Sequence, residues 1–319
     1  MPNWVSDMEQ HVAYHRPVLL DETIAALNVV PDGVYVDGTA GGGGHSFAIA
    51  SQLRGGRLLA LDQDPEAVEQ ASRRLEGLPA TVIHRNFRFM GDVLDECGVD
   101  KVDGILLDIG VSSHQLDAGY RGFSYHTEAP LDMRMSREGV SAAELLATLS
   151  EKELADIFFR FGEEKFSCSI AKAVVQRRKD NPIATTAEFA DLICEAVPAA
   201  ARRKAHPARK VFQALRIAVN DELTCLSEAL DVAFDRLKVG GRLAVITFHS
   251  LEDRMVKQRF SAWCEGCICP KEFPVCVCGR TPAGQLVLRK PAEATPQELA
   301  ENPRSRSAKL RCIEKVHDR

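Results

Sequence analysis

The chain has 319 residues, of which 45% are hydrophobic and 27% are charged, with 40 Lys and Arg against 45 Asp and Glu. This length allows one large domain or one domain that carries an insertion. No apolar run approaches the roughly 18 residues of a membrane-spanning helix, and the first residues lack the apolar core of a signal peptide. We therefore expect a cytoplasmic protein with no membrane partner. The net charge of -5 argues weakly against a nucleic-acid binder, although local charge matters more than the sum.

Strand and helix patterns alternate in the first third of the chain. Short β-branched segments occur at 33–38, 57–62, 80–87 and 103–111. Helical segments separate them, and the clearest of these is PEAVEQASRRL, which has a proline in its first turn. This alternation predicts a parallel sheet with helices on both faces.

The pattern changes between about 115 and 209, where helices and loops occur without a convincing strand. Four segments show apolar spacing near 3.6 residues, namely SAAELLATLS, EKELADIFFRFG, FSCSIAKAVVQRRK and TTAEFADLICEAV. The α/β pattern then returns in DELTCLSEALDVAFDRLKVGGRLAVITF, followed by two closing strands in GQLVLRK and SAKLRCIEKV. The sequence predicts an α/β core in two parts, 1–114 and 210–319, interrupted by a helical substrate-recognition domain at 115–209.

A glycine-rich turn, VDGTAGGGGHS, lies between the first strand and the next helix. Glycines let a ligand touch backbone N–H groups, so this arrangement is typical of nucleotide sites. The turn is not a P-loop, because no Gly-Lys-Ser/Thr follows, and Ser46 stands where a third glycine of G-x-G-x-x-G would be. A tight turn without a ligand is the simpler alternative.

Asp62 follows the second strand, about 24 residues after Gly38, near the distance expected of an acid that binds ribose hydroxyls. NAD and S-adenosylmethionine are the two competing ligands. VDGTAGGGGHS, LDQDPEAV and LKVGGRLAVITF together resemble class I methyltransferases more than dehydrogenases. In those enzymes the first loop meets the methionine part of the cofactor, and the acid holds the ribose.

Asp108 ends the buried strand in DGILLDIGVSSHQLD, at the sheet edge where open α/β proteins bind ligands. It could simply cap the next turn. An exocyclic amine is a poor nucleophile, and acceptors for its N–H groups align its lone pair for attack. Asp108 and the backbone of 110–113 suit that task, so Asp108 is a candidate catalytic residue. The Pro-Pro-Tyr/Phe turn of many DNA amino-methyltransferases is missing, which disfavours DNA.

Longer segments identify a family. HRPVLLDETIAAL, VDGTAGGGGHS, DGILLDIGVSS, RKVFQALRIAVNDEL, FHSLEDRMVK and NPRSRSAKLR resemble the bacterial small-subunit (16S) ribosomal RNA cytidine-N4 methyltransferases of the MraW type. The resemblance extends from about 15 to 315. It implies a class I, Rossmann-like methyltransferase fold with an inserted all-helical domain, S-adenosyl-L-methionine as cofactor, and a decoding-centre cytidine as target.

The resemblance also implies a set of cofactor contacts. Matching the motifs residue by residue gives Gly43, Gly44, His45, Asp62, Phe87, Asp108 and Gln115. An apolar ring such as Phe87 is suited to lie against the adenine. An ordinary core position is the alternative for Phe87.

The segment TFHSLEDR places a dense polar group after the last strand before the cysteines. We interpret His249 as a second candidate catalytic residue, which would orient the target cytidine. The alternative is a helix start with Ser250 as N-cap and Asp253 at the third position. The two interpretations are compatible.

Two basic runs lie in and just after the predicted insertion. KFSCSIAKAVVQRRK has five bases and ARRKAHPARKVFQALR has six, and neither contains an acid. Lysine and arginine clusters supply phosphate contacts to RNA, whereas a solvated helix face is the usual explanation of such runs. Their occurrence as a pair favours ribosomal RNA as partner, within an assembled or assembling subunit; a homodimer is left open.

Five of the ten cysteines lie in CEGCICPKEFPVCVC. Cys267, Cys269, Cys276 and Cys278 could form a tetrahedral zinc site. Their C-x-C spacing is tighter than the usual C-x₂₋₄-C, so a reduced thiol cluster is the interpretation that the sequence alone favours.

Two other functions remain open from the sequence. One is a methyltransferase of the same fold that acts on DNA or on a small molecule. The other is a non-catalytic RNA-binding assembly factor, against which the glycine turn, Asp62 and Asp108 argue.

Overall fold

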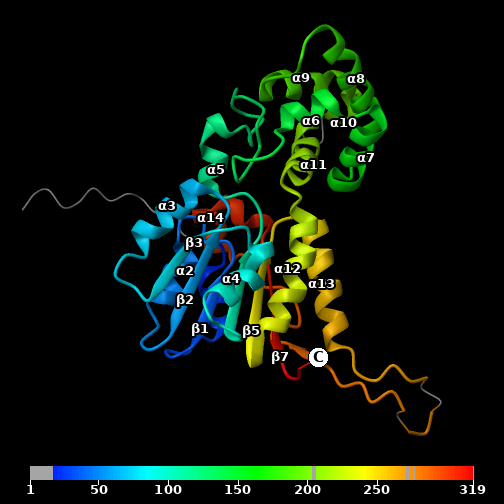
Figure 1. Ribbon diagram of the computed structural model, residues 1–319. Coiled ribbons are helices and arrows are strands. Elements are labelled where there is room, and N and C mark those ends of the chain that lie inside the picture. The colour runs from blue at the N-terminus through cyan, green and yellow to red at the C-terminus, as the bar shows by residue number, and fades with distance from the viewer. Residues whose placement is uncertain (1–16, 203–205, 271–272, 276, 319) are drawn as a thin grey trace, which may run out of the picture. The chain divides into compact units, whose positions relative to one another are not determined.

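The computed structural model describes residues 17–202, 206–270, 273–275 and 277–318. Within these ranges the chain forms two compact units. Unit 1 comprises the described residues of 17–109, 231–249 and 256–318, and unit 2 comprises those of 110–230 and 250–255. Figure 1 labels their elements along the chain. None of the helices in the described ranges is long and apolar enough to cross a membrane.

Unit 1 is built on a seven-stranded sheet of order β3-β2-β1-β4-β5-β7-β6. The strands are β1 (Val34–Asp37), β2 (Arg57–Asp62), β3 (Ala80–His84), β4 (Val102–Asp108), β5 (Leu237–Thr247), β6 (Gly284–Leu286) and β7 (Lys309–Lys315). The first five strands run parallel. The last two predicted strands close the sheet, and β7 lies antiparallel between β5 and β6. The predicted α/β, Rossmann-like fold is confirmed.

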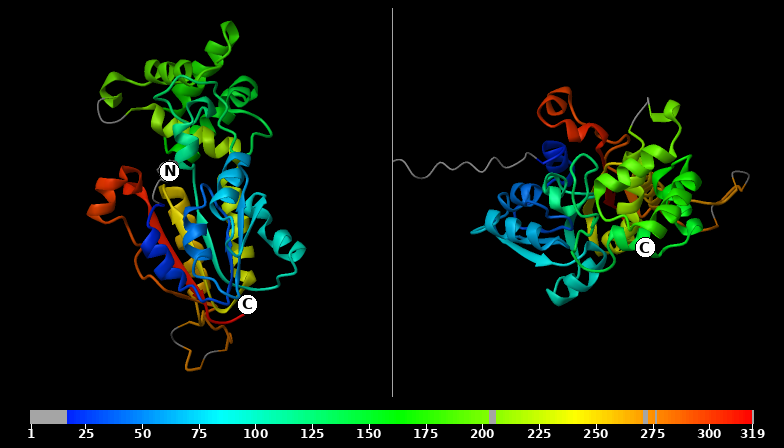
Figure 2. Two further views of the ribbon diagram at one scale, coloured as in Figure 1. Left: turned by 90° about the vertical axis from the view of Figure 1, so that its left-hand side faces the viewer. Right: turned by 90° about the horizontal axis from the view of Figure 1, so that it is seen from above.

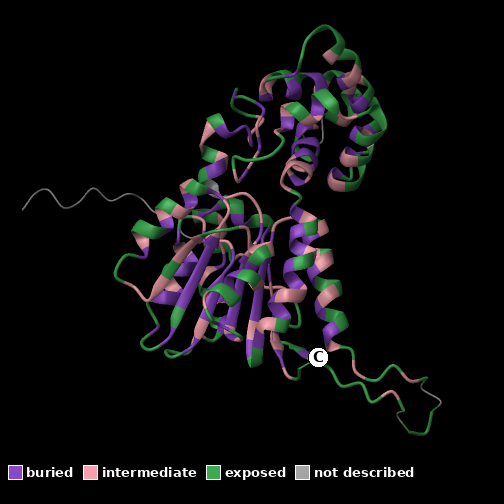
Figure 3. Ribbon diagram, viewed as in Figure 1, coloured by how far each residue is buried: buried purple, intermediate pink, exposed green. Residues whose placement is uncertain are grey.

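Helices cover both faces of this sheet, as the rotated views of Figure 2 show. Those of unit 1 and its joins to unit 2 are α1 (Leu20–Leu27), α2 (Gly44–Ala50), α3 (Pro65–Arg74), α4 (Met90–Glu96), α12 (Glu222–Arg236), α13 (Ser250–Cys264) and α14 (Pro296–Glu301). Alternate strand residues such as Leu58 and Leu106 form one core with apolar residues of α1, α2 and α3. The central strands β1, β2 and β4 and the second half of β5 are mostly buried, whereas the edge strands β3 and β6 are largely not (Figure 3), as expected of a parallel sheet whose centre is covered on both faces.

Unit 2 is helical. Its elements are α5 (Ser113–Asp117), α6 (Ala142–Thr148), α7 (Glu151–Gly162), α8 (Ser167–Asp180), α9 (Thr186–Ala196), α10 (Ala199–Arg202) and α11 (Ala208–Asn220). Short 3₁₀ turns complete the chain at 87–89, 119–121 and 303–307. Four helices of unit 2 begin with a capping box, and in three of them Ser141, Ser150 or Thr185 exchanges hydrogen bonds with a glutamate three residues later.

The helical unit includes more of the chain than the predicted insertion, 115–209. α11 belongs to it because its buried residues, among them Val211 and Leu215, join the core of unit 2. α7 and α11 approach so closely that a Cβ on Gly162 would lie 2.6 Å from the carbonyl oxygen of Lys210. The amphipathic pattern of α11 shows an apolar face but not which neighbour covers it, so the later boundary could not be predicted from the sequence.

Candidate functional site

Three neighbouring strands of unit 1 each end in an aspartate. Asp37 ends β1, Asp62 ends β2 and Asp108 ends β4. Because β2, β1 and β4 are adjacent and parallel, their carboxyl ends meet at one sheet edge. Ligands of open α/β sheets bind at this edge. Two of the three aspartates, Asp62 and Asp108, were predicted site residues.

The glycine turn at this edge is shaped largely by the chain itself. Gly41 and Gly43 have φ of +51° and +74°, which side chains rarely adopt. A Cβ on Gly43 would lie 3.2 Å from Cα of Ala71 in α3, and one on Gly44 would lie 2.3 Å from Pro17. Gly42 differs, because its φ is not in this region and a Cβ on it would make only an ordinary contact, 3.7 Å from Gln70. Backbone turning therefore accounts for Gly41 and Gly43, close packing accounts for Gly43 and Gly44, and Gly42 is under neither constraint.

Asp62 connects this turn to the end of β2. One carboxylate oxygen accepts the N–H of Gly41 at 2.7 Å, and the other accepts the N–H of Asp64 at 2.9 Å. Burial raises the pKa of Asp62 to about 6, with smaller contributions of the same sign from Asp64 and Asp37, while the two backbone hydrogen bonds lower it. Each oxygen keeps a second lone pair for another donor.

Asp37 is a buried acid at this edge that the sequence analysis did not single out. It is fully buried and accepts hydrogen bonds from the hydroxyl of Ser46 at 2.6 Å and from the N–H of Thr39 at 3.1 Å. Thr39 in turn accepts the N–H of Asp108 at 2.6 Å. Burial raises the pKa of Asp37, and the hydrogen bonds oppose this. The chain of contacts ties β1, α2 and β4 together behind the glycine turn.

His45 lies in the first turn of α2 and is buried. Its Nε2 is 3.0 Å from the carbonyl oxygen of Val18, which can only accept, so this nitrogen carries the proton. Burial lowers the pKa of His45 to about 4, so the ring is neutral near pH 7. Its Nδ1 is then an acceptor, and it lies 3.6 Å from a carboxylate oxygen of Asp108. Two acceptors at this separation suit a ligand that brings donors.

Phe87 begins the turn that follows β3 and is half-buried. Phe87 packs against the loop after β1, because a Cβ atom added to Gly38 would lie 3.0 Å from the Cβ atom of Phe87. The preceding residue, Asn86, donates to the side chain of Gln63 at 2.7 Å and so links the loops after β3 and β2. This cross-link could not be predicted from spacing. The position of Phe87 fits an apolar wall at the edge of the site.

Two further predicted site residues belong to different units, and His249 is in unit 1, just after the carboxyl end of β5 beside β4. Gln115 belongs to unit 2, where it is buried and its side-chain oxygen accepts the N–H of Ser112 in a capping box. His249 lies between β5 and α13. Ser250 is the first residue of α13, and it and Arg254 contact Glu163 within unit 2. The roles predicted for Gln115 and His249 stay predictions.

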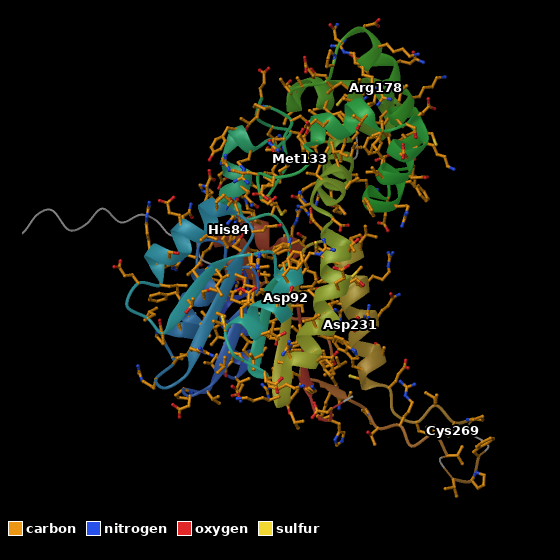
Figure 4. The ribbon with its side chains drawn as sticks, in the orientation of Figure 1. His84, Asp92, Met133, Arg178, Asp231 and Cys269 are labelled. Atoms are coloured by element: carbon orange, nitrogen blue, oxygen red, sulfur yellow. The ribbon has the colours of Figure 1, made fainter. Side chains whose placement is uncertain are left out.

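The basic runs are only partly available for a ligand. Arg178, labelled in Figure 4, donates to the carbonyl oxygens of Leu146 and Leu149. Arg216 forms a bidentate pair with Glu222 at 2.8 and 2.9 Å. Exposed bases remain, and three of them, Lys165, Lys172 and Lys179, recur every seven residues along α8 and the turn before it.

The chain has extensive similarity to known proteins. A family model described as the MraW methylase family matches residues 12–316. The chain belongs to this family.

Relatives of this MraW-family chain share one name. The Ribosomal RNA small subunit methyltransferase H of Heliobacterium mobile is 52% identical over 309 residues, covering 95% of this chain and 99% of the relative. That of Symbiobacterium thermophilum is 51% identical over 308 residues, covering 95% and 97%. Among solved structures, an rRNA methylase from Streptococcus thermophilus aligns with a TM-score of 0.43 and 11% identity, covering 95% of this chain and 98% of that one.

Proposed function

We propose that this MraW-family chain transfers a methyl group from S-adenosyl-L-methionine to the exocyclic N4 of a cytidine in 16S ribosomal RNA, at the decoding centre. The observation that carries the proposal is the match along nearly the whole chain to the MraW methylase family, whose relatives are named small-subunit ribosomal RNA methyltransferases. The glycine turn, Asp62 and Asp108, which belong to three of the predicted motifs, also lie at one edge of the sheet in unit 1.

The residues at this edge fit the cofactor. The second lone pairs on the two oxygens of Asp62 suit the two hydroxyls of a ribose. A Cβ on Gly41 or Gly42 would meet no close neighbour, which leaves room for a ligand at the turn; Gly43 and Gly44 shape it, and Phe87 offers an apolar face for the adenine. The bound cofactor supplies a methyl group on a positively charged sulfur.

Asp108 and His45 define the polar end of the site. The carboxylate of Asp108 and the unprotonated Nδ1 of neutral His45 both accept hydrogen bonds. They suit the ammonium group of the cofactor and, at Asp108, the N–H of the target amine. An acceptor for that N–H returns lone-pair density to the nitrogen and orients it, which is the chief contribution the chain can make to an in-line methyl transfer.

Unit 2 would hold the RNA around the target. Lys165, Lys172 and Lys179 are exposed and spaced to contact phosphates. The ring of Tyr125 stacks on that of His206, with centroids 4.7 Å apart and an angle of 17° between the planes. Such rings can stack with an unpaired base. A base within folded RNA must leave its stack to be methylated, so an additional stacking surface fits this substrate.

One assay can distinguish methyl transfer to RNA from transfer to DNA and from cofactor binding without transfer. We would offer labelled S-adenosylmethionine with unmodified small subunits, protein-free 16S rRNA, DNA, or no polymer, and identify the product nucleoside by mass spectrometry. N4-methylated cytidine from subunits or rRNA is the expected result. Transfer to DNA alone, or cofactor binding without transfer to any substrate, would contradict the proposal and favour a different substrate or an assembly factor.

Variants test the two candidate catalytic residues in the same assay. Asp108→Asn keeps the size of the side chain but removes its charge, and we expect turnover to fall at least about 100-fold. The control is Asp92→Asn, an exposed aspartate on α4 that is labelled in Figure 4, and it should leave turnover unchanged. Full turnover in His249→Ala would remove His249 from the catalytic set.

A further inference from the structure

A long loop of unit 1 gathers three cysteines. It connects the end of α13 at Cys264 to β6 at Gly284, and its described residues form no helix or strand. Figure 4 shows Cys269 on this loop, well away from the sheet of the same unit. The sulfur atoms of Cys267, Cys269 and Cys278 all lie within 4.8 Å of one another. The remaining predicted ligand, Cys276, lies outside the described residues.

The spacing of the sulfur atoms fits ligands of one metal ion. The Sγ atoms of Cys267 and Cys278 are 3.7 Å apart. A disulfide would bring them to about 2.05 Å. In a tetrahedral zinc site with Zn–S bonds of about 2.3 Å, neighbouring sulfurs are about 3.8 Å apart. The sulfur atoms of Cys267 and Cys278 therefore lie at the distance expected of two ligands of one zinc ion.

Backbone amides point at two of these sulfurs. The N–H of Cys269 donates to Sγ of Cys267 at 3.4 Å, and the N–H of Val277 donates to Sγ of Cys269 at 3.3 Å. Such donors fix the orientation of the sulfur atoms. The second bond also connects the two ends of the loop, because eight residues separate Val277 from Cys269.

The large apolar side chains of this loop are exposed, so burial of apolar surface does not hold the loop in place. Ile268, Phe273, Val275 and Val277 are 51–74% exposed. A segment that buries little apolar surface must offset the entropy of ordering in another way, and a structural metal is one of the few means available to short segments.

We propose that Cys267, Cys269 and Cys278 bind a structural zinc ion that ties the two arms of this loop together. Thiolates are soft ligands that prefer zinc among the divalent metals compatible with tetrahedral geometry. The sequence offers a fourth thiol in Cys276. Each thiol that coordinates the ion releases its proton to solvent, so binding weakens as the pH falls. The ion has no part in methyl transfer.

Metal analysis of the full chain tests the site. Reduced protein is loaded with zinc, passed through gel filtration and measured by mass spectrometry for metals. We expect about one zinc per chain, and less than a tenth of that in Cys269→Ser and in Cys278→Ser. Cys97→Ser, a cysteine at the end of α4 in the same unit, should keep the full amount. Unchanged affinity for S-adenosylhomocysteine in each variant shows that the core is folded.

Two further measurements identify the ligands and the role. Cobalt loaded in place of zinc should give thiolate charge-transfer absorption that disappears in Cys269→Ser. A chelator should speed tryptic cleavage after Arg280, which is exposed in the loop, several-fold. Reduced wild-type protein without zinc, cysteine variants that retain it, a Cys267–Cys278 disulfide in zinc-treated protein, or cleavage indifferent to the chelator would each overturn the proposal.

Discussion

Asp62 holds the backbone of the glycine turn and is also the residue that we propose for the ribose of the cofactor. Its oxygens hold the backbone of Gly41 and Asp64. Burial raises its pKa to about 6, so ionisation favours the unfolded chain, in which the carboxyl ionises near its ordinary value of 3.8. Its contribution to stability is therefore greatest in acid, falls as the pH rises from about 3.8 to 6, and is constant above that range.

The affinity for the cofactor should increase as Asp62 ionises, whereas the contribution of Asp62 to folding stability decreases. A charged Asp62 accepts both ribose hydroxyls, whereas a protonated one loses an acceptor. We expect affinity for S-adenosylhomocysteine to be flat from pH 7 down to about 6 and to fall by up to about tenfold for each unit below it. His45, with a pKa of about 4, does not titrate in this range.

Calorimetric titrations between pH 5 and 7 check this dependence. Asp62→Asn should bind at least about tenfold more weakly at pH 7, the loss of one charged hydrogen bond, and should show no change with pH. Asp92→Asn should keep the wild-type profile. A pH dependence that persists in Asp62→Asn would assign the titration to another group.

Neighbouring glycines of the turn should respond differently to the same substitution. Gly43 has a left-handed backbone and contacts α3, so Gly43→Ala should lower the free energy of unfolding by about 1–2 kcal/mol. Gly42 has no left-handed backbone, and a Cβ on it would make only an ordinary contact with α3, so Gly42→Ala should cost well under about 1 kcal/mol. Urea unfolding measures both. Equal losses would show that the conformation of the turn differs from the one described.

The sequence predicted the partly exposed aspartates of this site, Asp62 and Asp108, but not the fully buried Asp37. Asp62 and Asp108 could be found because each ends a recognisable strand at the expected spacing. Asp37 does so too, but its bond to Ser46 in α2 depends on how far the helix rotates the serine toward the sheet. Local pattern gives the residue types, whereas packing decides which polar side chains pair.

Helix starts follow a short local pattern in the sequence. Ser or Thr followed three residues later by Glu forms a capping box at α6, α7 and α9 but not at α14, where the side chain of Glu298 instead accepts the N–H of Leu19. The direction in which a basic helix points was harder to predict. Arg178 and Lys179 are adjacent in sequence, yet the arginine caps two carbonyl groups while the lysine remains exposed.

The exposed lysines of α8 should act together on RNA. Removing Lys165, Lys172 and Lys179 as a triple alanine variant should weaken binding to 16S rRNA and reduce the slope of log affinity against log salt by about 2 to 3. The reason is that each phosphate contact releases about one counterion. Filter binding at several salt concentrations measures the slope. Lys152→Ala, on α7 between two glutamates, should change neither quantity, and an unchanged slope in the triple variant would place the RNA on another surface.

At the scale of the whole chain, two cores divide the molecule. One core joins the sheet of unit 1 to α1, α2 and α3, and the other lies within 123–215. The sequence predicted an α/β core interrupted by helices because the period of the apolar pattern changes from two to 3.6. It did not place the boundary, since α12 and α13 continue as unbroken helices from one unit into the other.

This division predicts that cofactor and RNA protect different parts of the chain. S-adenosylhomocysteine should slow hydrogen exchange of backbone amides in 38–46, in 62–65 and at the end of β4, because the predicted contacts lie there. An rRNA fragment should instead slow exchange in α8 and around Tyr125 and His206, where exposed bases and the stacked rings lie. Exchange followed by mass spectrometry, with each ligand alone and with both, measures the two footprints. If both ligands protected unit 1 and left α8 unchanged, the helical unit would have no direct part in holding RNA, and its exposed lysines would be a solvated helix face.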